Sequence, residues 1–266
     1  MKNKTIRMGG SYMTLYGSNT IRQSVIKNRE FLDYICVIHQ RKPIFENTTC
    51  PDEEMMYAEL LKLKKEKYID DLIICEKKFD ENVEKYVLRK RNMGLKLCKK
   101  NKCDYIVPLD ADEIYLKETK DIIARNNFDT YYTKIKTYYC DPTLCFEDNY
   151  YVPFAYKIDD RKFKLSYTNS VIVDPLRNMK EKKFAILNNQ FMHHYSINKE
   201  ILLMKMNDNI GKLNNKVVMN MWNYMLAFIE VEFDGTKALV FDHALQSKFV
   251  PLTVNENSPW VVNENN

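Results

Sequence analysis

The stretch that decides the fold is Cys103–Tyr115, CDYIVPLDADEIY. Its apolar run, Tyr105–Leu109, is too short for an ordinary helix and is rich in residues that favour extended, buried backbone, so it predicts a central β-strand. Asp110 and Asp112 follow this run directly and therefore stand at the carboxyl end of the strand. In an open α/β sheet that edge is where ligands bind.

The spacing of these two acids predicts a metal site. Carboxylates this close repel each other, and a cation between them relieves the repulsion. Mg²⁺ and Mn²⁺ prefer oxygen ligands and usually complete their shells with substrate phosphate oxygens. The alternative is an acidic turn that caps the next predicted helix, Lys117–Asn127, because Asp and Glu favour helix starts. The motif alone fits both interpretations.

Strands and helices alternate up to this stretch. Strands are predicted over residues 6–16, 33–38, 71–75 and 105–109, and helices over residues 20–31, 52–67 and 81–100. Ser18 or Asn19 is a suitable N-cap for the first helix. The alternation is typical of parallel strands joined by right-handed crossovers. It predicts an α/β fold with a mostly parallel, Rossmann-like central sheet flanked by helices.

The second half of the chain has a different pattern. It predicts short strands over residues 130–140, 151–158, 164–173 and 183–187. Helices are predicted after them, over residues 197–212 and 216–228. No linker or repeat interrupts the chain, so we expect one domain over residues 1–254, with an α/β half at 1–128 and a mixed α+β half at 129–254. The Asn- and Glu-rich residues 255–266 are expected to be a flexible tail.

Composition limits the setting of the protein. The 266 residues carry 41 basic and 36 acidic side chains, and the net charge of +5 suits an anionic partner such as a nucleotide or an anionic membrane face. Seven cysteines without a CxxC pair are typical of free thiols in a reducing compartment. No apolar run reaches the about 20 residues that span a bilayer. We expect a cytoplasmic protein that could touch the inner membrane face peripherally, with no nucleic-acid partner.

Three features together resemble the family 2-like branch of the GT-A fold glycosyltransferases. They are the order of elements, Arg91-Asn92-Met93-Gly94 in the helix before the acidic strand, and Leu109-Asp110-Ala111-Asp112-Glu113. The resemblance implies that Asp112 binds a divalent ion, Mn²⁺ or Mg²⁺, that bridges the donor diphosphate, and that Asp110 contacts the ribose or the metal. It also implies that Arg91 and Asn92 line the nucleotide-sugar pocket. Gly94 within a helix costs about 1 kcal/mol relative to Ala, which indicates a close backbone approach there.

The resemblance also gives each half of the domain a role. Residues 1–128 would form the nucleotide-sugar-binding half, and residues 129–254 would form the acceptor-side half. The loop after the first strand would bring Tyr16 and Asn19 toward the nucleotide. The second strand ends in Ile38-His39-Gln40-Arg41, where the family usually has acidic residues, so His39 is the expected contact and the donor base stays open.

The run FMHHYS, residues 191–196, could complete the metal shell, because imidazole is a common metal ligand. In a strand His193 and His194 point to opposite faces, so only one of them can face the site, and we favour His194. The alternative is that one packs in the core and the other hydrogen-bonds at the surface.

An inverting transferase also needs a base for the acceptor hydroxyl. Asp174, expected at a strand end, and Asp148, expected in a loop over the site, are the candidates. A retaining enzyme needs no such base.

The resulting hypothesis is a metal-dependent glycosyltransferase that moves a sugar from a nucleotide-sugar donor to a glycan or lipid-linked acceptor, in cell-surface polysaccharide or glycoconjugate synthesis. One alternative is a nucleotidyltransferase on a related fold, for which Gly9-Gly10-Ser11 is a faint trace of a phosphate-binding loop. Another is a non-catalytic carbohydrate-binding domain.

Overall fold

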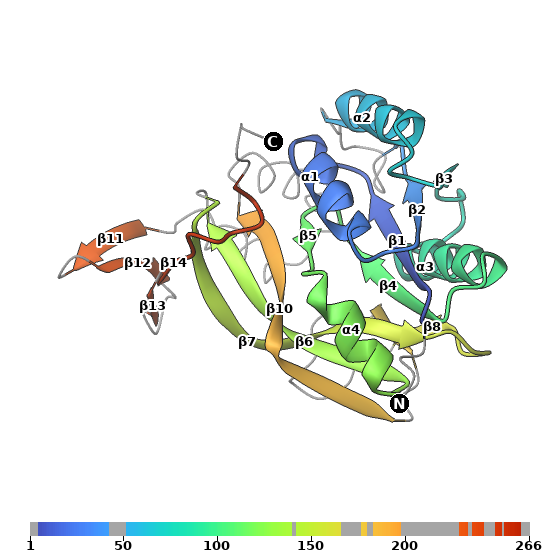
Figure 1. Cartoon of the computed structure of the whole chain (residues 1–266). Coiled ribbons are helices and arrows are strands. Elements are labelled where there is room, and N and C mark those ends of the chain that lie inside the picture. Colours follow the sequence, from blue (N-terminus) through green and yellow to red (C-terminus); the bar gives the residue numbers. More distant parts are fainter. Residues whose placement is uncertain are drawn as a thin grey trace.

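The structure is a computed structural model, and it describes residues 5–42, 52–139, 142–165, 177–179, 183–197, 229–233, 236–241, 248–251 and 253–261. A large mixed sheet runs through these residues and carries helices on both faces (Figure 1). The α/β class predicted from the sequence is confirmed.

The first half follows the predicted alternation. In chain order its elements are β1 (Met8–Thr14), α1 (Ser18–Arg29), β2 (Tyr34–His39), α2 (Glu53–Lys65), β3 (Asp71–Ile74), α3 (Val83–Lys100) and β4 (Tyr105–Leu109). The strands lie in the order β3-β2-β1-β4 and all pair in parallel. The chain thus moves outward from β1 to β3 and then returns past β1 to β4.

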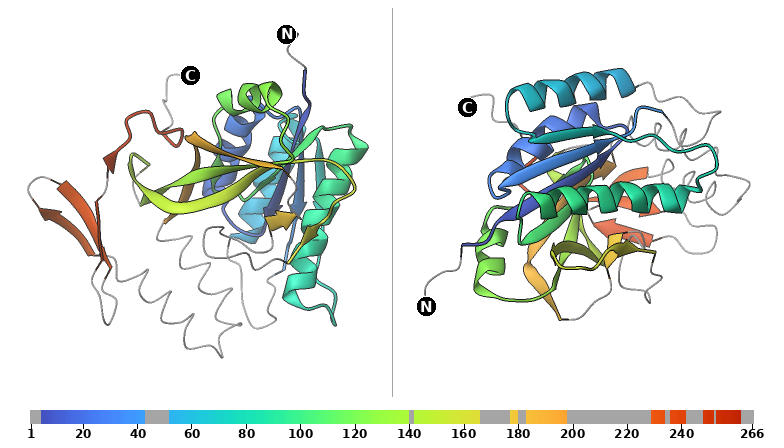
Figure 2. Two further views of the ribbon diagram at one scale, coloured as in Figure 1. Left: turned by 90° about the horizontal axis from the view of Figure 1, so that it is seen from below. Right: turned by 90° about the vertical axis from the view of Figure 1, so that its right-hand side faces the viewer.

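This reversal decides where the helices lie. Right-handed crossovers that run in opposite directions use opposite faces of a sheet. Accordingly α1 and α2 cover one face and α3 covers the other (Figure 2). Val25 and Leu60 belong to the core on the first face, whereas Leu95 and Cys98 belong to a separate core with Cys36 of β2. The reversal lies between β1 and β4, and in open α/β sheets the carboxyl ends of the strands at such a point are where ligands bind.

The first half ends with the short β5 (Glu113–Ile114) and with α4 (Glu118–Arg125). The second half extends the sheet with β6 (Thr130–Tyr139), β7 (Leu144–Lys157), β10 (Phe184–Ile197) and β14 (Thr253–Val254). β7 pairs with β4 and with β6 in antiparallel fashion, β10 runs parallel to β6, and the short β5 pairs with β10.

Two small sheets lie outside this arrangement. They are formed by β8 (Phe163–Lys164) with β9 (Asn178–Met179), and by β11 (Ile229–Phe233), β12 (Thr236–Phe241) and β13 (Lys248–Pro251). The helices expected over 197–212 and 216–228 lie outside the described residues.

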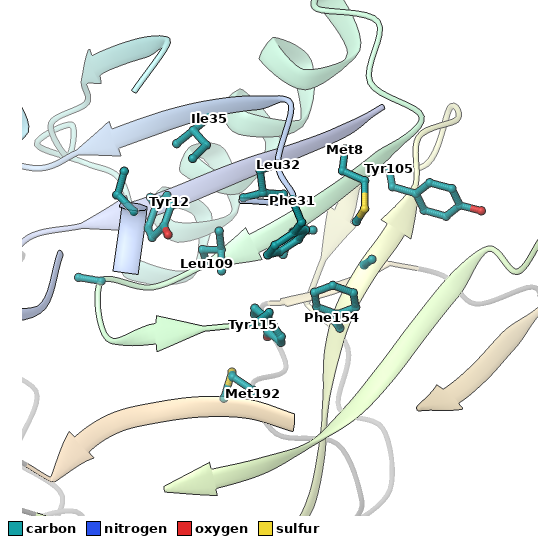
Figure 3. Close-up of a cluster of buried hydrophobic side chains, with 14 of the residues drawn as sticks. Met8, Tyr12, Phe31, Leu32, Ile35, Tyr105, Leu109, Tyr115, Phe154 and Met192 are labelled. Carbon is teal, nitrogen blue, oxygen red and sulfur yellow. The ribbon is translucent and has the colours of Figure 1, made fainter. Parts of the chain in front are cut away.

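Aromatic packing joins the two halves. The rings of Tyr115, just after β5, and Phe154 of β7 have centroids 4.4 Å apart, and Met192 of β10 belongs to the same core cluster (Figure 3). Part of the tail that was expected to be flexible, up to Val261, is ordered, because Trp260 packs in a separate cluster with Ile114, Tyr138 and Cys145. Trp260 is 5% exposed and its ring lies 5.6 Å from that of Tyr195. Large apolar rings gain enough from burial to order a polar segment around them.

The N-terminus of α1 differs from the prediction. Neither Ser18 nor Asn19 caps the helix, because Gly17 is the N-cap, with a left-handed φ of 108° and no side-chain bond. Instead Asp52, just before α2, accepts hydrogen bonds from the backbone N–H groups of Gly17 and Ser18, at 2.6 and 2.9 Å. A carboxylate is stabilised at this end of a helix by the helix dipole.

The predicted close approach at Gly94 is confirmed. A Cβ on Gly94 would lie 1.7 Å from the Ser11 Oγ atom, so α3 packs directly on β1 because this position has no side chain. Gly9 and Gly10 lie inside β1 and not in a phosphate-binding loop. No helix in the described parts of the chain is long and apolar enough to cross a membrane.

Candidate active site

The acidic turn Asp110-Ala111-Asp112 directly follows β4, at the carboxyl end of this strand. The loop after β1 touches it, since a Cβ on Gly17 would lie 3.0 Å from the Ala111 Cβ atom. Tyr16, which is half-buried in this loop, and Asn19, which is exposed in the first turn of α1, flank this contact in the sequence. The structure thus brings these predicted donor-binding and metal-binding residues to one edge of the sheet.

One arginine links two of the three acids. The Arg177 guanidinium, just before β9, lies 2.7 Å from Asp110 Oδ2 and 2.8 and 3.1 Å from the two carboxylate oxygens of Glu113. Arg177 and Glu113 are each 2% exposed, whereas the Asp110 side chain is 40% exposed. The planar guanidinium fork matches a carboxylate, which makes the contact with Glu113 bidentate.

Burial and charge act in opposite directions on Glu113. Burial raises the pKa of this carboxyl and is the larger effect, whereas the Arg177 charge acts to lower the pKa. A buried carboxylate without a partner would take up a proton. The charged form of Glu113 therefore depends on Arg177.

Side chains of α1 fix the backbone of β5. Ser24 Oγ and Asn28 Nδ2 donate to the Glu113 carbonyl oxygen at 2.6 and 2.8 Å, and Asn28 Oδ1 accepts from the Tyr115 N–H at 2.9 Å. Both side chains are fully buried, and buried networks of this kind hold a single geometry. Because of them, Glu113 keeps its place relative to the end of β1.

The two histidines of β10 have different neighbours, as predicted for adjacent residues of a strand, whose side chains point to opposite faces of the sheet. His194 Nε2 lies 3.6 Å from Asp112 Oδ2 and is paired in register with Glu113 of β5. His193 is buried and its Nδ1 atom lies 2.6 Å from the Tyr138 hydroxyl oxygen. Burial lowers the pKa of His193 to about 4, so this imidazole is neutral at pH 7. The geometry places His194, and not His193, beside the acidic turn.

The donor set can be tested for its fit to a divalent ion. Two atoms that each lie about 2.1 Å from a shared ion are separated by about 3.0–3.4 Å, so the 3.6 Å between Asp112 and His194 needs only a small adjustment. Among the described residues no three His, Cys, Asp or Glu side chains converge on a point that could hold a metal. The Asp112–His194 pair is compatible with Mg²⁺ or Mn²⁺, which usually complete their shells with water and substrate phosphate oxygens.

Three predicted donor-binding residues lie within the first half, where Arg91 and His39 are buried and Asn92 is half-buried. Arg91, in α3, is 3% exposed, and His39 is fully buried at the end of β2, with its Nδ1 atom 3.0 Å from Thr14 Oγ1. The Asn92 amide holds β8 against α3, because it donates to the Phe163 carbonyl oxygen at 3.1 Å and accepts from the Phe163 N–H at 3.0 Å. The contacts given for His39 and Asn92 are with other parts of the fold, and the contact of all three residues with a donor stays a prediction.

The expected bases are placed only in part. Asp148 lies within β7, opposite Ile135 of β6, so its expected position in a loop is wrong: β7 continues through the segment in which a loop was expected. Asp174 lies outside the described residues.

Glu113, Arg177 and Asp52 have roles that the sequence does not reveal. Three neighbouring acids indicate that a cationic side chain lies close to them. The sequence does not indicate that this side chain is Arg177.

Comparison with protein-family models found no match, and comparison with curated proteins also found none. Among solved structures, TarS from S. aureus matches with a TM-score of 0.45 and 12% identity over 84% of this chain and 42% of that one. The TarS fragment 1–349 in complex with UDP-GlcNAc matches with a TM-score of 0.43, 14% identity, and 84% and 71% of the two chains. The mannosyltransferase PcManGT from Pyrobaculum calidifontis, in complex with GDP-Man and Mn²⁺, matches with a TM-score of 0.45, 8% identity, and the same 84% and 71%.

These structural neighbours include glycosyltransferases, and the chain spans less than half the length of complete TarS. A likeness at such scores does not establish an activity. The function of this chain has to be inferred from its own residues.

Proposed function

We propose that this chain is a metal-dependent glycosyltransferase of the family 2-like GT-A type, which transfers a sugar from a nucleotide-sugar donor to a glycan or lipid-linked acceptor. The observation that supports it best is the arrangement at the end of β4. There Asp112 and His194 lie 3.6 Å apart at the carboxyl edge of the parallel strands, beside two acids that share Arg177 as their cationic partner.

In this proposal Asp112 and His194 hold Mn²⁺ or Mg²⁺. The ion would stabilise the diphosphate leaving group as a Lewis acid. Asp110 contacts the ribose or the ion with its exposed side chain, while Arg177 keeps Asp110 oriented. His193 is the weaker candidate for a ligand, because its Nδ1 atom is engaged with Tyr138 and its ring is buried.

The donor lies across the carboxyl ends of β1 and β4. Tyr16 and Asn19 contact the nucleotide from the first loop, with His39, Arg91 and Asn92 as the further donor-binding residues. If the enzyme inverts configuration, Asp174 or Asp148 serves as the base. The acceptor belongs to cell-surface polysaccharide or glycoconjugate synthesis, and the enzyme works in the cytoplasm, where it could contact the inner membrane face.

Calorimetry with a panel of nucleotide-sugars, with and without Mn²⁺, tests the proposal. We expect Mn²⁺-dependent binding and slow donor hydrolysis, and Asp112→Asn should weaken Mn²⁺ binding at least about 100-fold, since losing a ligand costs more than losing the group that supports it. The matched control is Asp80→Asn, because Asp80 is exposed in the loop before α3 and its replacement should leave both measurements unchanged.

The outcomes separate the competing functions. A wild-type protein that binds no member of the panel in the presence of Mn²⁺ would refute the proposal. Metal-independent binding of free glycans, without nucleotide binding, would instead identify a carbohydrate-binding domain. Release of pyrophosphate from a nucleoside triphosphate would identify a nucleotidyltransferase, although the strand position of Gly9-Gly10-Ser11 gives that function no support.

A further inference from the structure

Two cysteines lie together at the C-terminal end of α3, at the edge of the sheet opposite the acidic turn. The helix ends in a Schellman motif, in which the Cys103 N–H donates to the Cys98 carbonyl oxygen at 3.1 Å and the Lys102 N–H donates to the Lys99 carbonyl oxygen at 3.1 Å. Lys102 has the left-handed φ of 58° that the motif requires. This motif brings the side chains of its first and last residues together, and here both are cysteine.

The two sulfur atoms share one gap in the core. A Cβ on Gly9 of β1 would lie 2.7 Å from Cys98 Sγ and 2.9 Å from Cys103 Sγ. Both thiols therefore use the space that the missing side chain of Gly9 leaves, and they hydrogen-bond each other. The backbone hydrogen bond between these residues keeps them at the short range that a disulfide needs, about 4.4–6.8 Å between Cα atoms.

The two thiols are not equivalent. Cys98 is fully buried, whereas Cys103 retains 6% exposure. The hydrogen bond with Cys98 lowers the pKa of Cys103 and so does the nearby Arg7, while burial and Asp33 oppose them. The same hydrogen bond raises the pKa of Cys98. This pattern gives one thiol that ionises more readily and reacts first, and a second that stays protonated beside it.

We propose that Cys98 and Cys103 form a redox-active dithiol, a modification site at which a hydroperoxide makes an intramolecular disulfide. The Cys103 thiolate attacks the peroxide oxygen, which gives a sulfenic acid at Cys103 and releases hydroxide, or an alkoxide from an organic hydroperoxide. The Cys98 sulfur then attacks the sulfenic sulfur, and water leaves. Overall the two thiols lose two electrons and two protons, the peroxide is reduced, and a thiol reductant reverses the change.

The chain itself supplies a direct assay. Lys99, Lys100 and Lys102 lie between the two cysteines, so trypsin separates them into peptides 97–99 and 103–117. The folded protein is treated with one equivalent of hydrogen peroxide, alkylated under denaturing conditions and digested. We expect the two peptides to appear linked, with the intact mass lowered by two hydrogen atoms, and dithiothreitol to restore the separate peptides.

Variants distinguish this site from the other thiols. Cys98→Ser should prevent the link and leave Cys103 as a sulfenic acid, which dimedone traps. Cys36→Ser is the matched control, because Cys36 also contacts Cys98 but should not be needed for the link. Circular dichroism checks that each variant is folded. A Cys36–Cys98 link in the wild type, loss of the link in Cys36→Ser, or no linked peptide while other cysteines oxidise would overturn the proposal.

Discussion

Replacing Arg177 by Met should destabilise the protein more than any change of an exposed charge. Arg177→Met keeps a similar side-chain volume but leaves Glu113, 2% exposed, without its guanidinium partner. Removing one partner of a buried pair costs about 3–5 kcal/mol, because the other charge stays buried and uncompensated. The contact with Asp110, whose side chain is 40% exposed, adds at most about 1 kcal/mol. The expected loss is therefore set by Glu113.

The loss should depend on pH in a defined direction. Without Arg177 the pKa of Glu113 is raised by burial and by the Asp110 charge and is lowered only by His194, so the folded pKa lies above the unfolded value of 4.5. A carboxyl with a raised folded pKa binds its proton more tightly in the folded state, so the folded protein gains stability relative to the unfolded one as the pH falls. Arg177→Met should thus approach the wild type at acidic pH and differ most from it near pH 7.

Urea unfolding of four proteins measures this directly: the wild type, Arg177→Met, Glu113→Gln and the double variant. The double variant should recover at least half of the free energy of unfolding that Arg177→Met loses, since a neutral amide needs no counter-charge. An Arg177→Met protein that loses less than about 1 kcal/mol, or a double variant no more stable than Arg177→Met, would refute the reasoning.

Three further changes test the fold around the site, each by urea unfolding. Gly94→Ala should lower the free energy of unfolding by about 1–3 kcal/mol, because its Cβ would meet Ser11 Oγ. Ser11→Gly in the same chain should restore part of this loss. Additive effects of the two substitutions would contradict the close approach. Burial lowers the pKa of His39 to about 4 from an unfolded value of 6.5, so the wild type should lose about 3 kcal/mol of stability as the pH falls from 6.5 to 4. His39→Gln should lack this part of the slope, and an unchanged slope would mean that His39 is not buried neutral. Asn82→Ala should cost about 1 kcal/mol, because the Asn82 side chain caps α3 by accepting from the Lys85 N–H, while Asn82→Asp should keep the cap.

The first half of the fold was predictable because its signals are local. The run Tyr105–Leu109 forms β4 within the predicted bounds, and the alternation before it predicts the parallel pairing, while the order β3-β2-β1-β4 is known only from the structure. Once the strands are parallel, Asp110 and the loop after β1 must meet at the same edge. Short-range apolar patterns and crossover handedness suffice for this part.

The rest depends on contacts between residues far apart in the sequence. Arg177 and Glu113 are separated by 64 positions, and β5 is a two-residue strand that exists because β10 and the side chains of α1 hold it. The cap of α1 comes from Asp52, 35 positions from Gly17. No local propensity marks such partners, so the sequence located the acids but not the groups that neutralise or hold them.

The contacts of Arg177 and His194 indicate different roles for Glu113 and Asp112. Glu113 is buried and committed to Arg177, so it organises the turn and is not accessible to a ligand. Three carboxylates and one guanidinium leave two negative charges at the turn, which is the charge that one divalent cation balances. Arg177 contacts Asp110 and Glu113, whereas His194, a candidate metal ligand, lies 3.6 Å from Asp112. The geometry therefore favours Asp112 as the principal ligand, with Arg177 preventing its neighbours from repelling one another when no cation is bound.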